Sequence, residues 1–337
     1  MSITIPFIRG FALFPTLSWF ARRGIPVEEA LHAVSLPRDM VAFPCRPVPL
    51  VQAAALLQTC ARQIGPDLPY RIVSEADDLE IAMLGRVGLG TGTPREALAR
   101  IIAALPFYCS HEHVSMRKTT SSTIVSEFFS HRFDPETTHL LLQYAATMID
   151  RICGMTGAAR SRFLKIELPA HPEFGLTHLT GCFGPDIVAS RSRGLSILID
   201  NQIMDRPFGS CARDRLNGRQ LPDHNPLRGD GTLAASVRLL LVSMIEDGQA
   251  ITIEPVVSAA GLSARSFQRQ LKEEGRSFSK LLAETRRSET QKRLHETDVT
   301  IASIAAELGY ADQASLTRAF RRWTGSAPRH FRVQRSP

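Results

Sequence analysis

The chain has 337 residues, of which 44% are hydrophobic and 22% are charged, so it is long enough for two folded domains and too apolar for a disordered chain. The formal charge of +7 is concentrated near the C-terminus, because residues 233–337 hold 16 Lys and Arg against 11 Asp and Glu, whereas residues 1–232 hold 24 against 22. A basic C-terminal third favours a polyanionic partner, although charge alone would also suit a membrane surface.

The apolar stretch at residues 3–20 contains two prolines, an arginine and a glycine, so it predicts neither a transmembrane helix nor a signal peptide. We therefore expect a cytoplasmic protein without a membrane partner. Cysteines are scattered and form no C-x-x-C pair, which favours reduced thiols over a disulfide framework or a zinc site. They are Cys45, Cys60, Cys109, Cys153, Cys182 and Cys211. We expect no cofactor and no metal.

The first two thirds of the chain alternate between two periodicities. Helical spacing at residues 25–62, broken by the proline-rich segment 44–49, predicts short helices, and Thr93-Pro94 predicts a capped helix start. β-branched and aromatic residues at 107–131 predict a hairpin or three short strands. Further along, we expect a helix at 137–153 and strands at 163–168 and 194–199. Residues 1–204 are therefore predicted to form one α+β domain.

The segment 205–232 is polar and rich in Pro and Gly, which is typical of an interdomain linker. Every segment after it has helical spacing, so residues 233–337 are predicted to form an all-α domain. We expect these helices at residues 233–247, 253–260, 264–274, 278–295, 301–308, 313–324 and 328–333.

The helical region contains one pattern twice, at an offset of 48 residues before an internal turn and 49 after it. Each copy has the parts of a helix-turn-helix, in which a second helix presents its N-terminal half to the major groove of DNA. A small scaffold residue lets the helices approach (Val257 and Ala305), a glycine makes the turn (Gly261 and Gly309), and a polar residue caps the second helix (Ser263 and Asp312).

Apolar residues at helical spacing predict which faces of the second helices are buried. Phe267 and Leu271 should face the core in the first copy, as should Leu316, Phe320 and Trp323 in the second. The remaining polar side chains are candidates for contacts with double-stranded DNA. For base edges we predict Arg265, Gln268, Arg269, Gln313, Ser315, Thr317 and Arg318, and for phosphates Lys272, Arg321 and Arg322.

The connecting helix at 278–295 should set the distance between the two copies. If it holds the second helices roughly 34 Å apart, they can enter successive major-groove turns on one face of DNA.

The segment 301–332, with LGYADQASLTRAFRRWTGSAPRHFR, resembles the signature of the AraC/XylS family of transcriptional regulators, over roughly residues 233–335. Departures from the family pattern are Leu316, Thr290, and Val257 with Ala260. Residues 1–204 resemble the effector-binding domain of the ornithine-utilisation type of AraC regulator, through motifs such as Phe183-Gly184-Pro185 and Asp205-Arg206-Pro207. The resemblance implies a homodimeric regulator, more often an activator, with a small-molecule effector of unknown identity and with RNA polymerase as a partner.

Other features have competing interpretations. His111-Glu112-His113 with Cys109 could seed a metal site, but ordinary hydrogen-bonded histidines are favoured. Buried thiols are likewise favoured over redox sensors at Cys153 and Cys182. The aromatic residues Phe107, Tyr108, Phe128, Phe129 and Phe133 could line an effector pocket, but core packing is favoured.

Two other functions remain as alternatives. One is an alkyl-transfer repair enzyme acting through Cys45, which has no zinc-binding cysteines near it in the sequence. The other is a regulator whose N-terminal domain senses a protein partner. No residue is predicted to be catalytic, because no nucleotide-binding or hydrolase motif occurs.

Overall fold

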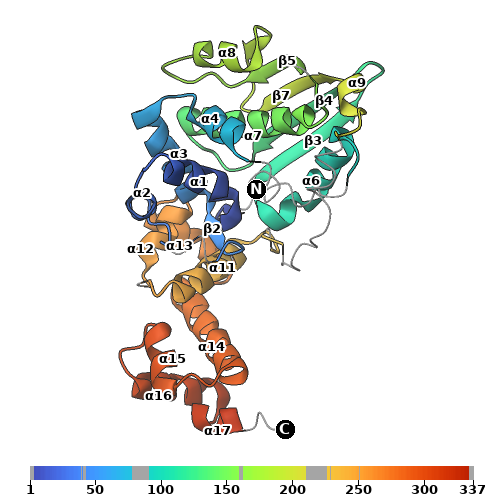
Figure 1. Cartoon of the computed structure of the whole chain (residues 1–337). Coiled ribbons are helices and arrows are strands. Elements are labelled where there is room, and N and C mark those ends of the chain that lie inside the picture. Colours follow the sequence, from blue (N-terminus) through green and yellow to red (C-terminus); the bar gives the residue numbers. More distant parts are fainter. Residues whose placement is uncertain are drawn as a thin grey trace. The chain divides into compact units, whose positions relative to one another are not determined.

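The computed structural model describes residues 4–38, 40, 43–77, 91–158, 162–209, 226–227, 229–249 and 251–333 (Figure 1). The chain divides into two compact units, Pro6–Arg228 and Met1–Ile5 with Gly229–Pro337. The first unit is α+β and the described part of the second is helical, which confirms the predicted fold class. Most of the predicted linker lies outside the described residues, and the division between the units falls within it.

The first unit begins with a small layer of helices around a two-stranded antiparallel sheet. Its elements are β1 (Phe7–Arg9), a 3-10 turn (Gly10–Leu13), α1 (Phe14–Arg22), α2 (Val27–Ala33), β2 (Pro47–Pro49), α3 (Leu50–Ile64) and α4 (Leu68–Glu75). The short helices are as predicted, but the proline-rich segment pairs with β1 in place of forming a simple break. Trp19 and Phe20 of α1 are buried at the centre of this layer.

Helix α6 (Pro94–Tyr108) starts where the sequence predicts, since Thr93 caps it by accepting a hydrogen bond from the Glu96 amide. It runs further than expected. Phe107 and Tyr108 are helical and do not belong to a strand, because the helix continues through Pro106 into its last turn. A proline there removes only one hydrogen bond near the end of a helix.

A five-stranded sheet forms the second layer, in the order β3-β4-β7-β5-β6. The strands are β3 (Glu112–Lys118), β4 (Ser122–Phe129), β5 (Phe163–Leu168), β6 (Ile187–Ala189) and β7 (Leu195–Asp200), and only β5 and β6 pair in parallel. The predicted hairpin is β3-β4. Helix α7 (Pro135–Gly154), capped by Asp134, packs on the sheet through Leu142, Ala146 and Ile149 (Figure 1).

Short elements complete this unit: a 3-10 turn (Thr177–Leu179), α8 (Thr180–Phe183) and α9 (Asn201–Met204). Phe208 is only 3% exposed and packs in the core of the sheet layer, and its amide donates to the carbonyl of Gly92. The compact part of this unit therefore extends beyond the boundary of 204 that composition predicts.

The second unit consists of seven helices within its described residues. They are α11 (Leu233–Glu246), α12 (Ile253–Ala259), α13 (Ala264–Glu273), α14 (Phe278–Glu296), α15 (Ile301–Glu307), α16 (Gln313–Thr324) and α17 (Pro328–Val333). Each one ends within one residue of its predicted boundary. Ile5 belongs to this unit, since its amide donates to Ser236 Oγ at 3.1 Å. Among the described residues, none of the helices combines the length and hydrophobicity that a bilayer crossing requires.

Candidate functional site

The first helix-turn-helix is formed by α12 and α13. Phe267 and Leu271 are buried on one face of α13, as predicted. Gly261 has a φ of 64°, a left-handed conformation that costs glycine little. Ser263 Oγ accepts from the amide of Ser266 at 3.2 Å and so satisfies one orphan donor of α13. The predicted turn and cap are therefore both present.

The second helix-turn-helix, α15 and α16, repeats this plan around a larger core. Leu316 and Phe320 of α16 are fully buried in a cluster that also holds Ile245, Leu294, Ile304, Ala305 and Leu308. Gly309 has a φ of 70°, and Asp312 accepts from the Ser315 amide at 2.6 Å. Trp323 was expected to be buried, but it is only half-buried at the edge of the cluster, where it meets Phe320 edge-on.

The two scaffold helices differ at the position predicted to permit close approach. Ala305 is buried, whereas Val257 is only half-buried, so the two scaffold helices differ in burial at this position. The valine side chain has two more carbon atoms than that of alanine, and a close helix crossing would have to accommodate them. In the first copy the small buried residues are instead Ala259 and Ala260.

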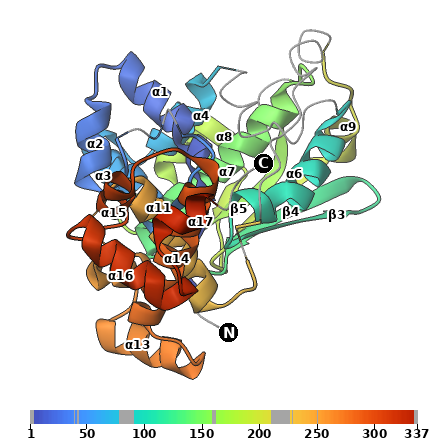
Figure 2. The same ribbon diagram turned by 90° about the horizontal axis from the view of Figure 1, so that it is seen from below.

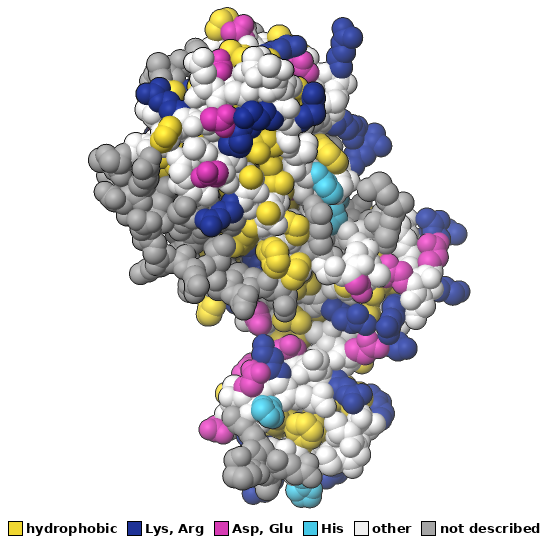
Figure 3. Space-filling model, turned by 90° about the vertical axis from the view of Figure 1, so that its right-hand side faces the viewer, with side chains coloured by type: hydrophobic (Ala, Val, Ile, Leu, Met, Phe, Trp, Pro, Cys, Tyr) yellow, Lys and Arg dark blue, Asp and Glu magenta, His cyan; other side chains and the backbone are white. Residues whose placement is uncertain are grey.

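The side chains predicted to contact DNA lie mainly on open surface. The exposed ones are Arg265, Gln268, Arg269 and Lys272 on α13 and Gln313, Arg318, Arg321 and Arg322 on α16. In the space-filling view, Lys and Arg side chains gather on the right-hand flank of the lower, C-terminal part of the chain (Figure 3). This exposure is compatible with contacts to DNA, and the individual roles remain predictions.

Two of the predicted residues on α16 are half-buried and already hydrogen-bonded. The hydroxyl of Thr317 donates to the Gln313 carbonyl at 2.8 Å, so it is bonded within its own helix. Ser315 Oγ accepts from Arg318 Nη2 at 2.9 Å. Ser315 thus orients the guanidinium of Arg318, whereas Arg269 on α13 has only a long, exposed ion pair with Glu273 at 3.8 Å.

Arg286 is a residue whose importance the sequence did not reveal. It lies on α14, and its guanidinium donates to the carbonyls of Leu308 at 2.8 Å and Gly309 at 3.1 Å. The same group lies over the ring of Tyr310, 4.8 Å from its centroid. Burial lowers the pKa of Arg286. One side chain therefore fixes the turn of the second copy to the connecting helix.

Helix α14 is the spacer between the two copies, which lie at its opposite ends (Figure 1). Its 19 residues correspond to about 28 Å of helix, close to the roughly 34 Å between major-groove turns. Arg293 of α14 bonds Glu289 at 2.7 Å and Glu307 of α15 at 3.0 Å. Viewed from below, α15, α16 and α17 surround one end of α14 (Figure 2). The spacing is thus set by one continuous, braced helix.

Thr290 of α14 replaces the alanine expected from the family resemblance. It is fully buried, and its hydroxyl donates to the Arg286 carbonyl at 2.6 Å. The hydrogen bond satisfies the added polar group within the helix, which explains how the substitution is accommodated.

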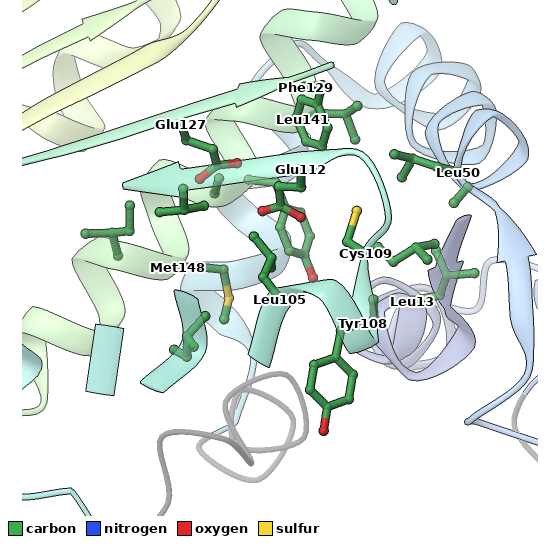
Figure 4. A pocket seen from close by; sticks show the side chains of 18 of the residues that line it. Leu13, Leu50, Leu105, Tyr108, Cys109, Glu112, Glu127, Phe129, Leu141 and Met148 are labelled. Carbon is green, nitrogen blue, oxygen red and sulfur yellow. The ribbon is translucent and has the colours of Figure 1, made fainter. Parts of the chain in front are cut away.

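The first unit contains a cavity of about 210 Å³ between its two layers. Its walls come from α1, α3, α6, α7 and the β3-β4 hairpin, and most of the side chains that line it are apolar (Figure 4). The polar exceptions include Glu112 of β3 and Glu127 of β4. Apolar walls with a few convergent polar groups are typical of small-molecule sites. No motif in the sequence marks this cavity, since its lining comes from many separate elements.

Glu127 is the most unusual residue in the cavity wall, because it is an ionisable side chain buried in the interior of the protein. It is 3% exposed, and its Oε1 atom has no hydrogen-bond partner among the residues that the structure describes. Burial raises the pKa of Glu127 well above its ordinary value, and the hydrogen-bonded, like-charged Glu112 adds to the rise. Both residues lie on the face of the hairpin that lines the cavity.

The aromatic residues considered for a pocket divide into two groups. Tyr108 and Phe129 line the cavity. Phe107 and Phe128 are 39% and 50% exposed, so neither the pocket nor the favoured core interpretation applies to them. Phe128 points to the opposite face of β4 from Phe129, where it stacks on His113 with 4.9 Å between ring centroids. Phe133 packs edge-on against Phe129.

The thiols and the paired histidines are held in ordinary surroundings. Burial raises the pKa of Cys153 to about 12 and that of Cys182 to about 11, which disfavours reactive thiolates. His111 Nδ1 lies 2.6 Å from Ser110 Oγ. Within the described part of the chain no group of His, Cys, Asp or Glu is arranged to hold a metal ion. Cys211 lies outside the described residues.

Three histidines that the sequence analysis did not connect meet beside α7. His139 is fully buried, and its Nδ1 lies 2.7 Å from the Pro169 carbonyl, so Nδ1 must carry the proton. Its Nε2 then accepts from Nε2 of His178 at 3.1 Å, and the ring of His171 packs edge-on at 5.3 Å. Burial lowers the pKa of His139 to about 4. Spacings of 32 and 7 residues along the chain give no local signal for this cluster.

Comparison with known proteins gives matches for both units. The family described as the arabinose-binding domain of AraC transcription regulator, N-term, matches residues 24–208, which is more than half of the chain. The family described as helix-turn-helix domain matches residues 256–334.

Curated relatives match over shorter stretches. The HTH-type transcriptional regulator VirS of Mycobacterium tuberculosis is 32% identical over 137 residues, 40% of each protein. The ornithine utilization regulator of Pseudomonas aeruginosa is 31% identical over 103 residues, 31% of this chain and 30% of that protein. The chain thus spans less than half of the length of these relatives.

Among solved structures, the transcriptional regulator CdpR from Pseudomonas aeruginosa aligns over 96% of this chain and 98% of its own, with a TM-score of 0.41 and 16% identity. The named relatives are regulators. Because a single family match covers more than half of the chain and a second covers the duplicated helices, the chain belongs to the AraC family of transcriptional regulators.

Proposed function

We propose that this protein binds double-stranded operator DNA through α13 and α16, and that a small molecule in the cavity of the first unit controls this binding. The observation that carries the proposal is the pair of capped helices at the two ends of α14, each with buried apolar residues beneath and exposed basic residues above. Two such helices on one chain that enter successive major-groove turns would recognise a non-palindromic site.

The experiment is a fluorescence anisotropy titration with DNA from upstream of the protein's own gene. Replacing Arg269 and Arg318 together by alanine should weaken binding at least about 30-fold, because each bidentate contact contributes about 1–3 kcal/mol. Replacing Arg191 and Arg193 removes the same charge from an exposed turn of the first unit and should change affinity little. Equal losses in the two double variants would refute the assignment of these helices.

Further parts of the proposal concern the assembled regulator. We propose that it works in the cytoplasm as a homodimer that activates transcription through contact with RNA polymerase. Light scattering of the purified protein tests the dimer. Transcription in vitro from the bound promoter, with and without the protein, tests activation. Repression in that assay would reverse the sign while leaving DNA recognition intact.

A second candidate, alkyl transfer by Cys45, has less support. Cys45 is half-buried, and its backbone carbonyl accepts from Arg9 at 2.7 Å. An activated thiolate of this type needs a zinc cluster of cysteines, and the described residues include no group of His, Cys, Asp or Glu arranged to hold a metal ion.

A further inference from the structure

The β3-β4 hairpin places two carboxyl groups on one face. In its register Val114 lies opposite Glu127, and Glu112 lies opposite Phe129. Since side chains two residues apart on a strand share a face, Glu112 and Glu127 are diagonal neighbours across the two strands. Both line the cavity, and the close view shows them projecting from adjacent strands (Figure 4).

None of the described residues that line the cavity is Lys, Arg or His, so a ligand in it meets these two carboxyl groups and no cationic side chain of the wall. Like-charged side chains at diagonal cross-strand positions oppose folding when both are ionised. Glu127 is buried, and its Oε1 accepts no hydrogen bond. A buried acceptor without a donor costs about 1–3 kcal/mol in a folded protein. Such a group calls for an explanation, and a ligand that donates to it would remove the cost.

We propose that the cavity binds an apolar organic amine, whose ammonium group lies between Glu112 and Glu127 and whose apolar body lies among Leu98, Leu105 and Met148. This inference rests on the proposed function, since it specifies the class of the effector. An ammonium group offers three hydrogen-bond donors and a positive charge. Its binding displaces the proton that the two carboxyl groups share, and that proton passes to the solvent. A carboxylate ligand would add a third acid and is disfavoured.

The size of the cavity limits the amine. A dry cavity of about 150 Å³ in another protein accommodates benzene, and the cavity here measures about 210 Å³. A ring with a short side chain, on the order of ten non-hydrogen atoms, therefore matches the available space.

The test uses the full-length protein and three molecules of nearly equal shape: 2-phenylethylamine, 2-phenylethanol and phenylacetate. We expect the amine, in large excess over its Kd, to raise Tm by about 5 °C, because it binds the folded state alone. The alcohol should act more weakly and phenylacetate should have no effect. Equal or stronger stabilisation by the alcohol or the acid, or stabilisation by none of the three, would overturn the proposal.

Two variants localise the effect. Glu127→Gln keeps the shape of the side chain but removes its charge, and should weaken amine binding at least about 10-fold by calorimetry while leaving the weaker alcohol binding in place. Glu173→Gln, on an exposed turn that does not line the cavity, should bind the amine as the unaltered protein does. Undiminished amine binding by Glu127→Gln places the amine elsewhere and contradicts the proposal. If Glu127→Gln does not fold, the comparison of the three molecules in the unaltered protein decides the matter.

Operator binding measured in the same samples separates this inference from the proposed function. Binding of DNA that depends on Arg269 and Arg318 but not on any amine leaves DNA recognition standing and overturns the amine effector. Amine binding that depends on Glu127 but does not change operator affinity supports the ligand class and contradicts control of DNA binding by the cavity.

Discussion

The two units keep their important polar groups in opposite environments. On α13 and α16 the candidate groups are exposed cations, arranged by helical period above buried apolar residues. In the first unit, Glu127 and His139 are buried, and their properties come from neighbours on other elements. Exposed charges respond chiefly to salt, whereas buried titratable groups respond chiefly to pH. We therefore expect salt to change DNA binding by the second unit and pH to change the stability of the first unit.

Arg286 breaks this pattern, because it is a half-buried cation in the second unit, and its removal should have the largest effect on stability. Arg286→Ala deletes two hydrogen bonds from a charged donor to the carbonyls of Leu308 and Gly309, and should lower the free energy of unfolding by about 2–4 kcal/mol. Urea denaturation measures the loss. Arg287→Ala, at the exposed next position on α14, is the matched control and should change stability by less than about 0.5 kcal/mol. Similar values for the two variants would show that Arg286 does not fix the turn.

The next largest expected effect is the loss of stability of the first unit at acidic pH. The pKa of His139 is about 4 in the folded protein and 6.5 ordinarily, so the folded state binds fewer protons and acid favours unfolding. The contribution of neutral His139 to the free energy of unfolding is fully present above pH 6.5 and is lost as the pH falls to about 4. The loss amounts to at most about 3 kcal/mol.

Replacing His139 by asparagine should flatten the stability profile between these pH values, as measured by Tm. His32→Asn, on the exposed side of α2, should leave the profile unchanged. A profile that keeps its full slope without His139 would assign the acid sensitivity to other groups.

The smallest expected effect is a change in the salt dependence of DNA binding by the second unit. Lys272→Ala removes one candidate phosphate contact and should weaken operator binding by less than about 1 kcal/mol, equally for specific and unrelated DNA. The plot of log affinity against log salt concentration should become shallower by about one. An unchanged slope would mean that Lys272 does not lie near a phosphate.

The helices of the second unit could be predicted because the residues that define each helix and turn lie within a few positions of one another in the sequence. The repeated spacing of Phe267 with Leu271, and of Leu316 with Phe320, fixes both the helices and their buried faces. The glycines and capping residues that predict the turns from the sequence are also the residues that form them in the structure, with left-handed glycines and side-chain caps. The different burial of Val257 and Ala305 was not predictable, because a sequence offset equates positions without regard to side-chain volume.

The cavity and the Arg286 contacts could not be predicted in this way. Glu112 was considered only with the histidines beside it, because its partner Glu127 becomes its neighbour only through the register of the hairpin. Tyr108 was assigned to a strand because it stands at the start of the aromatic and β-branched stretch 107–131. The acceptors for Arg286 lie 22 and 23 residues further along the chain, beyond the range of any helical period.

Glu274, at the end of α13, accepts from the amides of Leu233 and Ala234 at 2.8 Å each, at the start of α11. The first turn of α11 follows directly on the segment that joins the two units along the chain. A displacement of that turn must therefore either carry the end of α13 with it or break two charge-assisted hydrogen bonds. Glu274 therefore couples the start of α11 to the end of α13, the helix that we propose contacts DNA.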